Sequence, residues 1–311
     1  MTHRVARWML PSMIVALTVS GLEVPAFGQR PYYATPPPGS GPVEIEPYEE
    51  FGGCSEEPAV LQRCGREKAK AFTPPRTPEG VPDLQGFWGR IGARTANNIE
   101  EHAAGYDGTG GRSLIIDPPD GRIPYQAWAR AKVDNHWEIY WNPIQECIPD
   151  TPPRESYTAG AIQVVQSPGY VFIMTEQVGT YRVIPTTPRP HVGSNIHLYM
   201  GDPRGRWEGN TLVVDVTNMK DRVWLDHMGN TFSESASLVE RFTMFHQDVI
   251  LYEVTITDPA VYTRPWTMAF GWRRNRTRGY QLMESSCWEG VQSWLRLFGS
   301  QKAMYRGGFA R

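Results

Sequence analysis

Residues 205–216, with the sequence GRWEGNTLVVDV, are the stretch that decides the fold. Gly209-Asn210 is a turn signal, and the run of β-branched residues after it favours a β-strand. The same pattern fills the second half of the chain, where short runs rich in Val, Ile, Tyr, Phe and Thr alternate with turn signals. Strands are expected at residues 161–166, 170–176, 180–185, 211–216, 237–245, 249–257 and 266–272.

The expected strands are joined by turns rather than by helices, which predicts an antiparallel meander. The fold class is therefore mainly β, with a curved antiparallel sheet or a calycin-like barrel. Ahead of the strands, the sequence predicts an N-terminal wrap that is helical and rich in loops. Helices are expected at residues 56–71, where Ser55-Glu56-Glu57-Pro58 gives a helix start, and at residues 126–141.

The N-terminus has the composition of an export signal. Arg4 and Arg7 precede an apolar run and a small-residue stop, which is the layout of a secretory signal peptide over residues 1–28. Residues 29–50 are rich in proline and predict an extended linker. We expect residues 51–311 to form a single β-rich domain, located in the periplasm or secreted. No apolar run reaches the ~20 residues that span a bilayer, so no transmembrane segment is expected.

Composition restricts the partners of the chain. The formal net charge is −2 and no long basic run is present, which argues against nucleic acid as a partner. With 40% hydrophobic and 12% aromatic residues, the chain can bury a large core. The expected partner is a small-molecule ligand or substrate, with no organic cofactor and no bound metal. The oligomeric state is left open.

Cys54, Cys64, Cys147 and Cys287 are the four cysteines of the chain, an even number that favours disulfides in an exported protein. Three pairings are possible. The short separation favours a bond between Cys54 and Cys64, which leaves Cys147 to pair with Cys287. A zinc site is the alternative, but the sequence has no CxxC pair.

One candidate acid lies on an expected strand. Alternation along residues 237–245 puts Glu240 and Arg241 on opposite faces, so one of them is directed toward the interior. A buried Glu240 requires a cation or a hydroxyl beside it, and Arg206 and Arg264 are the available partners. The alternatives for Glu240 are a catalytic carboxylate and a structural ion pair inside a barrel.

Three further candidates lie in turns and loops. Asp226 precedes His227 in a turn-like segment, where it is either a general base or a turn-forming residue. Glu234 lies in the same long loop, which could form the rim of a pocket. His197 is a candidate acid or base because imidazole titrates near neutral pH, and a metal site with His191 is a weaker alternative.

Aromatic and basic side chains are dense in the same region. The aromatic rings could line a cavity for a flat, hydrophobic or sugar-like molecule, or they could simply fill a small barrel. The two arginines could position an anionic group or a carbonyl. The candidate substrate-binding residues are Arg206, Trp207, Trp224, Tyr262, Arg264 and Trp266.

An ordered series of motifs resembles a family of secreted, largely uncharacterised bacterial proteins. That family carries TPDGxPDLxGxW-, DPPDGRIP- and GRWEGDTLVVDT-like segments, and the matching residues here are 77–88, 117–124 and 205–215. Asn210 and Phe232 depart from the family pattern, which usually has Asp and His there. The resemblance covers roughly residues 74–290. It implies export and a shared fold, and it carries no activity with it.

Two functions follow from these patterns as expectations. The first is an exported enzyme that acts by acid-base chemistry, as a hydrolase, lyase or isomerase, on a small aromatic, terpenoid or sugar-derived molecule. Its candidate acids and bases are Asp226, Glu234, Glu240 and His197. The alternative is a non-catalytic periplasmic protein that binds a hydrophobic or aromatic ligand.

Overall fold

The computed structural model describes residues 51–90, 98–103, 110–158, 160–287 and 302–307. All of these residues belong to one compact unit, which is mainly β as the sequence predicts. The expected signal peptide, residues 1–28, and the proline-rich linker, residues 29–50, lie outside the described residues. In the described part of the chain, none of the helices combines the length and apolar character needed to cross a membrane.

The helical elements are short except for the first. They are α1 (Pro58–Ala71), α2 (Ala127–Val133), α3 (His136–Ile139), α4 (Glu155–Thr158) and two 3-10 turns, Pro143–Glu146 and Gln177–Gly179. The strands before residue 186 are β1 (Gly86–Arg90), β2 (Ile115–Asp117), β3 (Tyr140–Trp141), β4 (Ile162–Ser167), β5 (Tyr170–Thr175) and β6 (Tyr181–Pro185). Those after it are β7 (Asp202–Glu208), β8 (Thr211–Thr217), β9 (Ser237–His246), β10 (Val249–Thr257), β11 (Trp266–Arg274) and β12 (Ala303–Met304).

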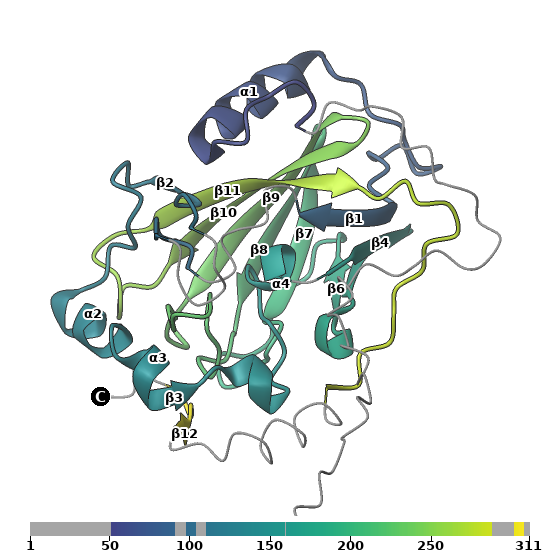
Figure 1. Cartoon of the computed structure of the whole chain (residues 1–311). Helices are drawn as coiled ribbons and strands as arrows, with labels where there is room; N and C mark the ends of the chain where they lie inside the picture. Colours follow the sequence, from purple (N-terminus) through teal and green to yellow (C-terminus); the bar gives the residue numbers. More distant parts are fainter. Residues whose placement is uncertain (1–50, 91–97, 104–109, 159, 288–301, 308–311) are drawn as a thin grey trace, which may run out of the picture. The chain divides into compact units, whose positions relative to one another are not determined.

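The main sheet is antiparallel and nearly closes into a barrel (Figure 1). Its strand order is β6-β5-β4-β1-β11-β10-β9-β8-β7, and β2 pairs separately with β11. Two meanders, β4 to β6 and β7 to β11, are therefore joined side by side through β1. The strand β1 pairs antiparallel with β4 on one side and with β11 on the other.

The barrel closes where the two edge strands, β6 and β7, pack against each other. Gly205 of β7 makes this approach possible, since a Cβ atom there would lie 2.9 Å from the Ile184 Cγ2 atom of β6. That distance is shorter than side chains tolerate. The two edges therefore meet through packing rather than through a ladder of hydrogen bonds, and a glycine is required at the contact.

Alternation along each strand separates an inner face from an outer face. The inner face carries the main core, and β9 and β10 contribute Phe242, Met244, Tyr252 and Val254 to it. On the outer face, α1 covers β9, β10 and β11, as Figure 1 shows at the top of the molecule. Leu61 of α1 is buried there in a second, smaller cluster, with residues of the strands.

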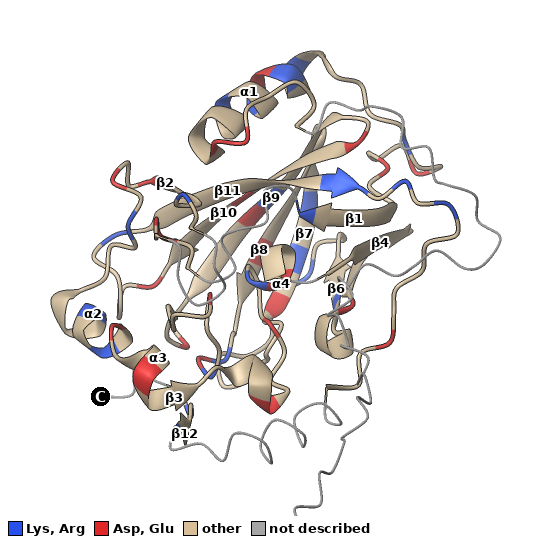
Figure 2. Cartoon of the chain, viewed as in Figure 1, with Lys and Arg blue, Asp and Glu red and all other residues tan. Residues whose placement is uncertain are grey.

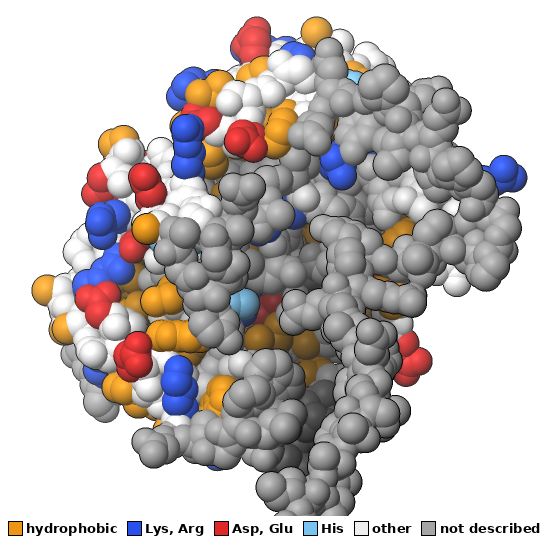
Figure 3. Space-filling model, in the orientation of Figure 1, with side chains coloured by type: hydrophobic (Ala, Val, Ile, Leu, Met, Phe, Trp, Pro, Cys, Tyr) orange, Lys and Arg blue, Asp and Glu red, His pale blue; other side chains and the backbone are white. Residues whose placement is uncertain are grey.

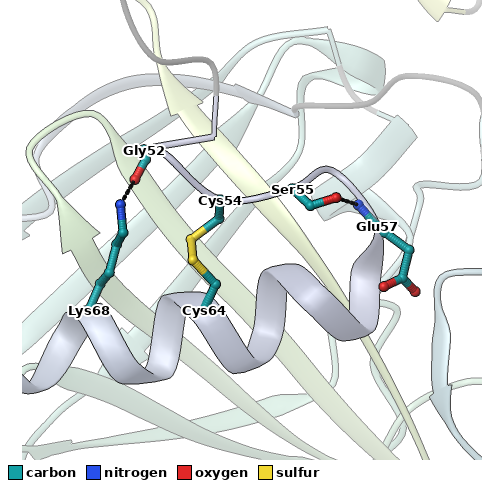
Figure 4. Close-up of a disulfide and its surroundings, with 6 residues drawn as sticks. All are labelled: Gly52, Cys54, Ser55, Glu57, Cys64 and Lys68. Atoms are coloured by element: carbon teal, nitrogen blue, oxygen red, sulfur yellow. Dashed lines mark hydrogen bonds between the residues drawn. A yellow bond between two sulfur atoms is a disulfide. The ribbon is translucent and has the colours of Figure 1, made fainter.

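Both expected disulfide pairs are confirmed. Cys54 and Cys64 are bonded with a Cα to Cα distance of 5.9 Å, which ties the segment before α1 to the middle of the helix (Figure 4). Cys147 and Cys287 are bonded at 5.7 Å and are 140 residues apart in sequence. The second bond connects the segment before the main strands to the segment after them.

A buried segment, residues 150–158, occupies the interior of the barrel, and we refer to it as the plug. It includes α4, which lies against the concave side of the sheet in Figure 1. The Trp272 Nε1 atom of β11 donates to the Ser156 carbonyl oxygen at 2.9 Å. The ring of Tyr157 packs edge-on against Phe270 with centroids 5.6 Å apart. The interior is therefore filled by the chain itself.

Two predictions about local structure need correction. The single helix expected at residues 126–141 is interrupted at Asp134-Asn135, between α2 and α3. The Asn135 side chain donates to the Ala131 carbonyl at 3.0 Å, and such side-chain bonds compete with helical ones. The expected simple meander is also incomplete, because β1 and β7 were not among the predicted strands.

Candidate functional site

A network of charged and polar groups lies inside the barrel, between the plug and the wall. Arg182 of β6 donates from Nη1 to Glu155 Oε1 at 2.7 Å and to Glu240 Oε1 at 3.0 Å, and from Nη2 to Glu240 Oε2. The Tyr252 hydroxyl donates to Glu240 Oε1 at 2.7 Å. All four residues are buried.

Glu240 therefore points inward and Arg241 outward, but the partner of Glu240 was not predicted. The expected partners, Arg206 and Arg264, lie outside the barrel, and Arg182 takes their place. Burial disfavours a charged guanidinium, but Glu240 and Glu155 outweigh this cost and raise the pKa of Arg182. Glu240 is thus held in a buried ion pair, remote from solvent.

Asp226 is also fully buried and organises a loop. Its carboxylate accepts from the backbone N–H groups of Ile99 at 3.1 Å, Met228 at 3.0 Å and Asn230 at 3.1 Å, and from Asn230 Nδ2 at 2.6 Å. Burial raises the pKa of Asp226 to about 6, although these hydrogen bonds act in the opposite direction. The carboxylate closes a turn and joins it to a segment 127 residues away in sequence.

His197 and Glu234 are brought together near the surface. The His197 Nε2 atom lies 3.9 Å from Glu234 Oε2, and the Glu234 side chain is half exposed. The other ring nitrogen, Nδ1, lies 3.2 Å from the Met219 carbonyl oxygen. Of the four candidate acids and bases, these two alone lie close to each other, while Asp226 and Glu240 lie in separate buried networks.

The two candidate arginines form exposed ion pairs. Arg206 contacts Glu208 at 3.0 Å and also Asp215 on the neighbouring strand. Arg264 contacts Asp117, which belongs to β2. Neither guanidinium is directed into an enclosed site, because each of these side chains is about half exposed.

The candidate aromatic residues are packing residues. Trp224 is stacked on the His136 ring with centroids 6.1 Å apart, and Trp266 meets the Tyr262 ring edge-on at 5.8 Å. The Tyr262 hydroxyl donates to the Thr231 carbonyl oxygen at 3.0 Å. Trp207 is partly buried against the main core. Within the described residues, these rings fill the interior.

A groove of about 510 Å³ lies on the outside of the barrel, between the C-terminal half of α1 and the outer face of β8 to β10. We refer to it as the outer groove. Its volume is in the range of small-molecule sites. Its lining is polar and carries three basic side chains with one acid: Arg66, Ala69, Lys70, Asn210, Thr211, Arg241, Thr243 and Glu253.

The acid of the outer groove is already satisfied. Glu253 is buried and accepts from Arg66 Nη2 and Gln62 Nε2, each at 2.7 Å. Lys70 pairs with Glu67 on the exposed surface of α1, and such surface pairs contribute little. Because this ion pair is weak, the Lys70 ammonium group can exchange Glu67 for a ligand.

Arg241 extends the positive side of the outer groove along β9. Its Nη2 atom lies 2.8 Å from Glu208 Oε2, and this contact holds the pKa of Glu208 below its ordinary value. The hydroxyls of Thr211 and Thr243 share a hydrogen bond of 2.8 Å beside it. Figure 2 shows that α1 and the strands below it carry charges of both signs.

Sequence reasoning missed the outer groove because its residues come from distant segments. Two signals pointed toward it. Arg66 and Lys70 are four residues apart and so share a face of α1. Alternation along β9 puts Arg241 and Thr243 on the outer face together. The packing of α1 on that face, which creates the groove, could not be predicted from either signal.

No protein-family model matches the chain, and no curated protein matches its sequence. The function is therefore inferred from the chemistry of the described residues. Among the described residues that are visible in Figure 3, basic and acidic side chains are interspersed, without a broad field of one sign. The side chains that line a local site therefore indicate the ligand better than the net charge of the whole chain does.

Proposed function

We propose that the protein is an exported binding protein that holds a small, polar, anionic molecule in the outer groove. The observation that carries this proposal is the lining of the groove, which holds three cations, Arg66, Lys70 and Arg241, and one acid, Glu253. The ion pairs of Lys70 with Glu67 and of Arg241 with Glu208 lie at its margin, and a bound anion would replace them. A carboxylate or phosphate accepts charge-assisted hydrogen bonds from such groups, and a guanidinium can bind it with two parallel bonds. Disulfides form in oxidising compartments, which supports export.

The neutral groups of the outer groove refine the ligand class. Thr211 and Thr243 contribute hydroxyl groups beside the cations, whereas the Asn210 amide is already bonded to Arg76 and to the Phe72 carbonyl oxygen. A ligand that bears hydroxyls as well as an acidic group would use both kinds of partner. A hydroxylated carboxylate or phosphate, such as a sugar acid, fits this combination better than the hydrophobic ligand expected from the aromatic content.

Calorimetric titration with D-glucuronate, glucose 6-phosphate and glucose tests the proposal. We expect the two anions to bind and glucose to bind more weakly. Replacing Arg241 by Gln should weaken anion binding at least tenfold, and salt should weaken it too. The control, Arg189→Gln, removes an exposed arginine elsewhere and should bind like wild type. Absence of binding by both anions, or equal affinity in Arg241→Gln, would reject the proposal.

An acid-base enzyme is the second candidate, supported by the 3.9 Å contact between His197 and Glu234. A carboxylate beside an accessible imidazole is an arrangement that supports proton transfer. Under this proposal, Nε2 of His197 is the base, the Met219 carbonyl oxygen orients the ring through Nδ1–H, and Glu234 stabilises the imidazolium that forms. Turnover of a panel of small esters, lactones and glycosides should then disappear in His197→Gln and persist in Asp226→Asn if that variant folds. A panel without any turnover in wild type removes this candidate.

We also propose membership of the family of secreted bacterial proteins that the motifs resemble. Two motif regions that are distant in sequence lie together here, namely residues 117–124 and the YTRPW segment at residues 262–266, which also belongs to the family pattern. Arg264 pairs with Asp117, and the Thr263 N–H donates to the Pro124 carbonyl oxygen at 2.8 Å. The contact between the two regions gives a structural reason why both motifs occur in one chain, and this supports the proposal. Crystal structures of two motif-bearing proteins with a different strand order would refute it.

A further inference from the structure

The plug brings a second carboxylate into a site that has one shared guanidinium. Glu155 and Glu240 both bind Arg182, but Glu240 makes two contacts with it and also accepts from Tyr252. Glu155 makes one contact, through Oε1, at 2.7 Å. Its other oxygen, Oε2, is buried without a hydrogen-bond partner among the described residues.

The charged groups around Glu155 come from the plug itself and from the wall. Within the plug, Arg154 is paired with Asp150 at 3.0 Å. The Tyr157 phenol interacts with Arg90 of β1 and donates to the Leu225 carbonyl oxygen. The wall contributes Arg182, Glu240 and Tyr252, described above.

These groups leave one negative charge too many when both glutamates are ionised. A single guanidinium neutralises one carboxylate, and a second buried carboxylate is strongly disfavoured at low dielectric. Glu240 has the better hydrogen bonds to its charged form, so the proton resides on Glu155. Burial, reinforced by Glu240, raises the pKa of Glu155 from 4.5 to about 7, against the opposing effect of Arg182.

We propose that Glu155 is a proton-controlled latch for the barrel: its protonated side chain holds the plug against Arg182, and loss of the proton to solvent releases the plug. Release would expose the inner face of the barrel, where Phe242, Tyr252 and Trp272 form an aromatic cluster. The exchange involves one proton and no other reactant. An exported protein experiences the pH of its surroundings, so such a latch would respond to alkalinisation.

The sign of the effect follows from linkage. The state with the plug inside binds the Glu155 proton more tightly than the released state, so low pH favours the plugged barrel. The released population rises between pH 4.5 and about pH 7 and then levels off. A difference of this size in proton affinity corresponds to roughly a 300-fold increase in the opening equilibrium.

Hydrogen exchange followed by mass spectrometry measures this opening directly. In the full-length, disulfide-bonded protein, exchange of the peptide covering residues 150–158 is compared at pH 5, 6, 7 and 8 after correction for the intrinsic rate. We expect the corrected exchange to increase steeply with pH in wild type. Glu155→Gln keeps a neutral side chain at every pH and should show slow exchange throughout.

Glu79→Gln is the matched control, because Glu79 is exposed and lies outside the network. It should show the wild-type pH dependence. Corrected exchange that is flat with pH in wild type, or an unchanged pH dependence in Glu155→Gln, would overturn the latch. If Glu155→Gln fails to fold, ¹³C NMR of the glutamate carboxyls in wild type decides: one should titrate near pH 7, and titration of all of them below pH 5 would overturn the proposal.

Discussion

Removing Arg182 should destabilise the protein strongly. Arg182 is buried and binds the carboxyl groups of both Glu155 and Glu240 on the inner face of the barrel. In Arg182→Met both carboxyl groups lose the guanidinium that binds them, and Tyr252 remains as the donor to Glu240. Removing one partner of a buried ion pair lowers the free energy of unfolding by about 3 to 5 kcal/mol. That is a large fraction of the ~5 to 15 kcal/mol by which native proteins are stable.

The assay is urea unfolding at pH 7 with both disulfides intact. A triple variant, Glu155→Leu with Arg182→Met and Glu240→Leu, removes the whole charged set and should lose far less stability, since replacing an entire buried ion network by apolar groups is often neutral. At pH 5 the deficit of Arg182→Met should shrink because the carboxylates can take up protons. A loss below about 1 kcal/mol in Arg182→Met, or an equal loss in the triple variant, would refute this reasoning.

Three further outcomes are expected from the same structure. Replacing Cys147 and Cys287 by Ala should lower the free energy of unfolding by about 4 to 5 kcal/mol in the entropic model, because the bond closes a loop of 140 residues; a denaturant midpoint unchanged from wild type would contradict this. Asp226→Asn should lower the free energy of unfolding by about 2 to 4 kcal/mol, because the new amide N–H groups face backbone donors. A melting temperature within a degree of wild type would argue against this. Gly205→Val should separate β7 from β6, since its Cβ would meet Ile184 at 2.9 Å, and hydrogen exchange should rise in those two strands but not in β10.

Much of the fold was predictable because strand periodicity is a local signal. The alternation in residues 237–245 correctly separates Glu240, which is buried, from Arg241, which lines the outer groove. The pairs Cys54 with Cys64 and Cys147 with Cys287 followed from locality and elimination.

What the sequence could not supply depends on contacts between distant segments. β1, with two glycines in GFWGR, has a weak strand signal and is ordered by its neighbours β4 and β11 on both sides. The bond from Arg182 to Glu240 joins residues 58 apart, across the barrel interior. No local pattern distinguishes a glutamate beside such a partner from one that lines a ligand cavity.

The most direct test of the account is to locate the ligand on the folded protein. Backbone amide chemical shifts are recorded by NMR during titration with D-glucuronate and with glucose as the neutral comparison. The outer groove predicts shifts for glucuronate at Arg66, Lys70, Thr211, Arg241 and Thr243, with the plug unchanged. Shifts confined to the barrel interior around residues 150–158, or to the loop that carries His197, would contradict it.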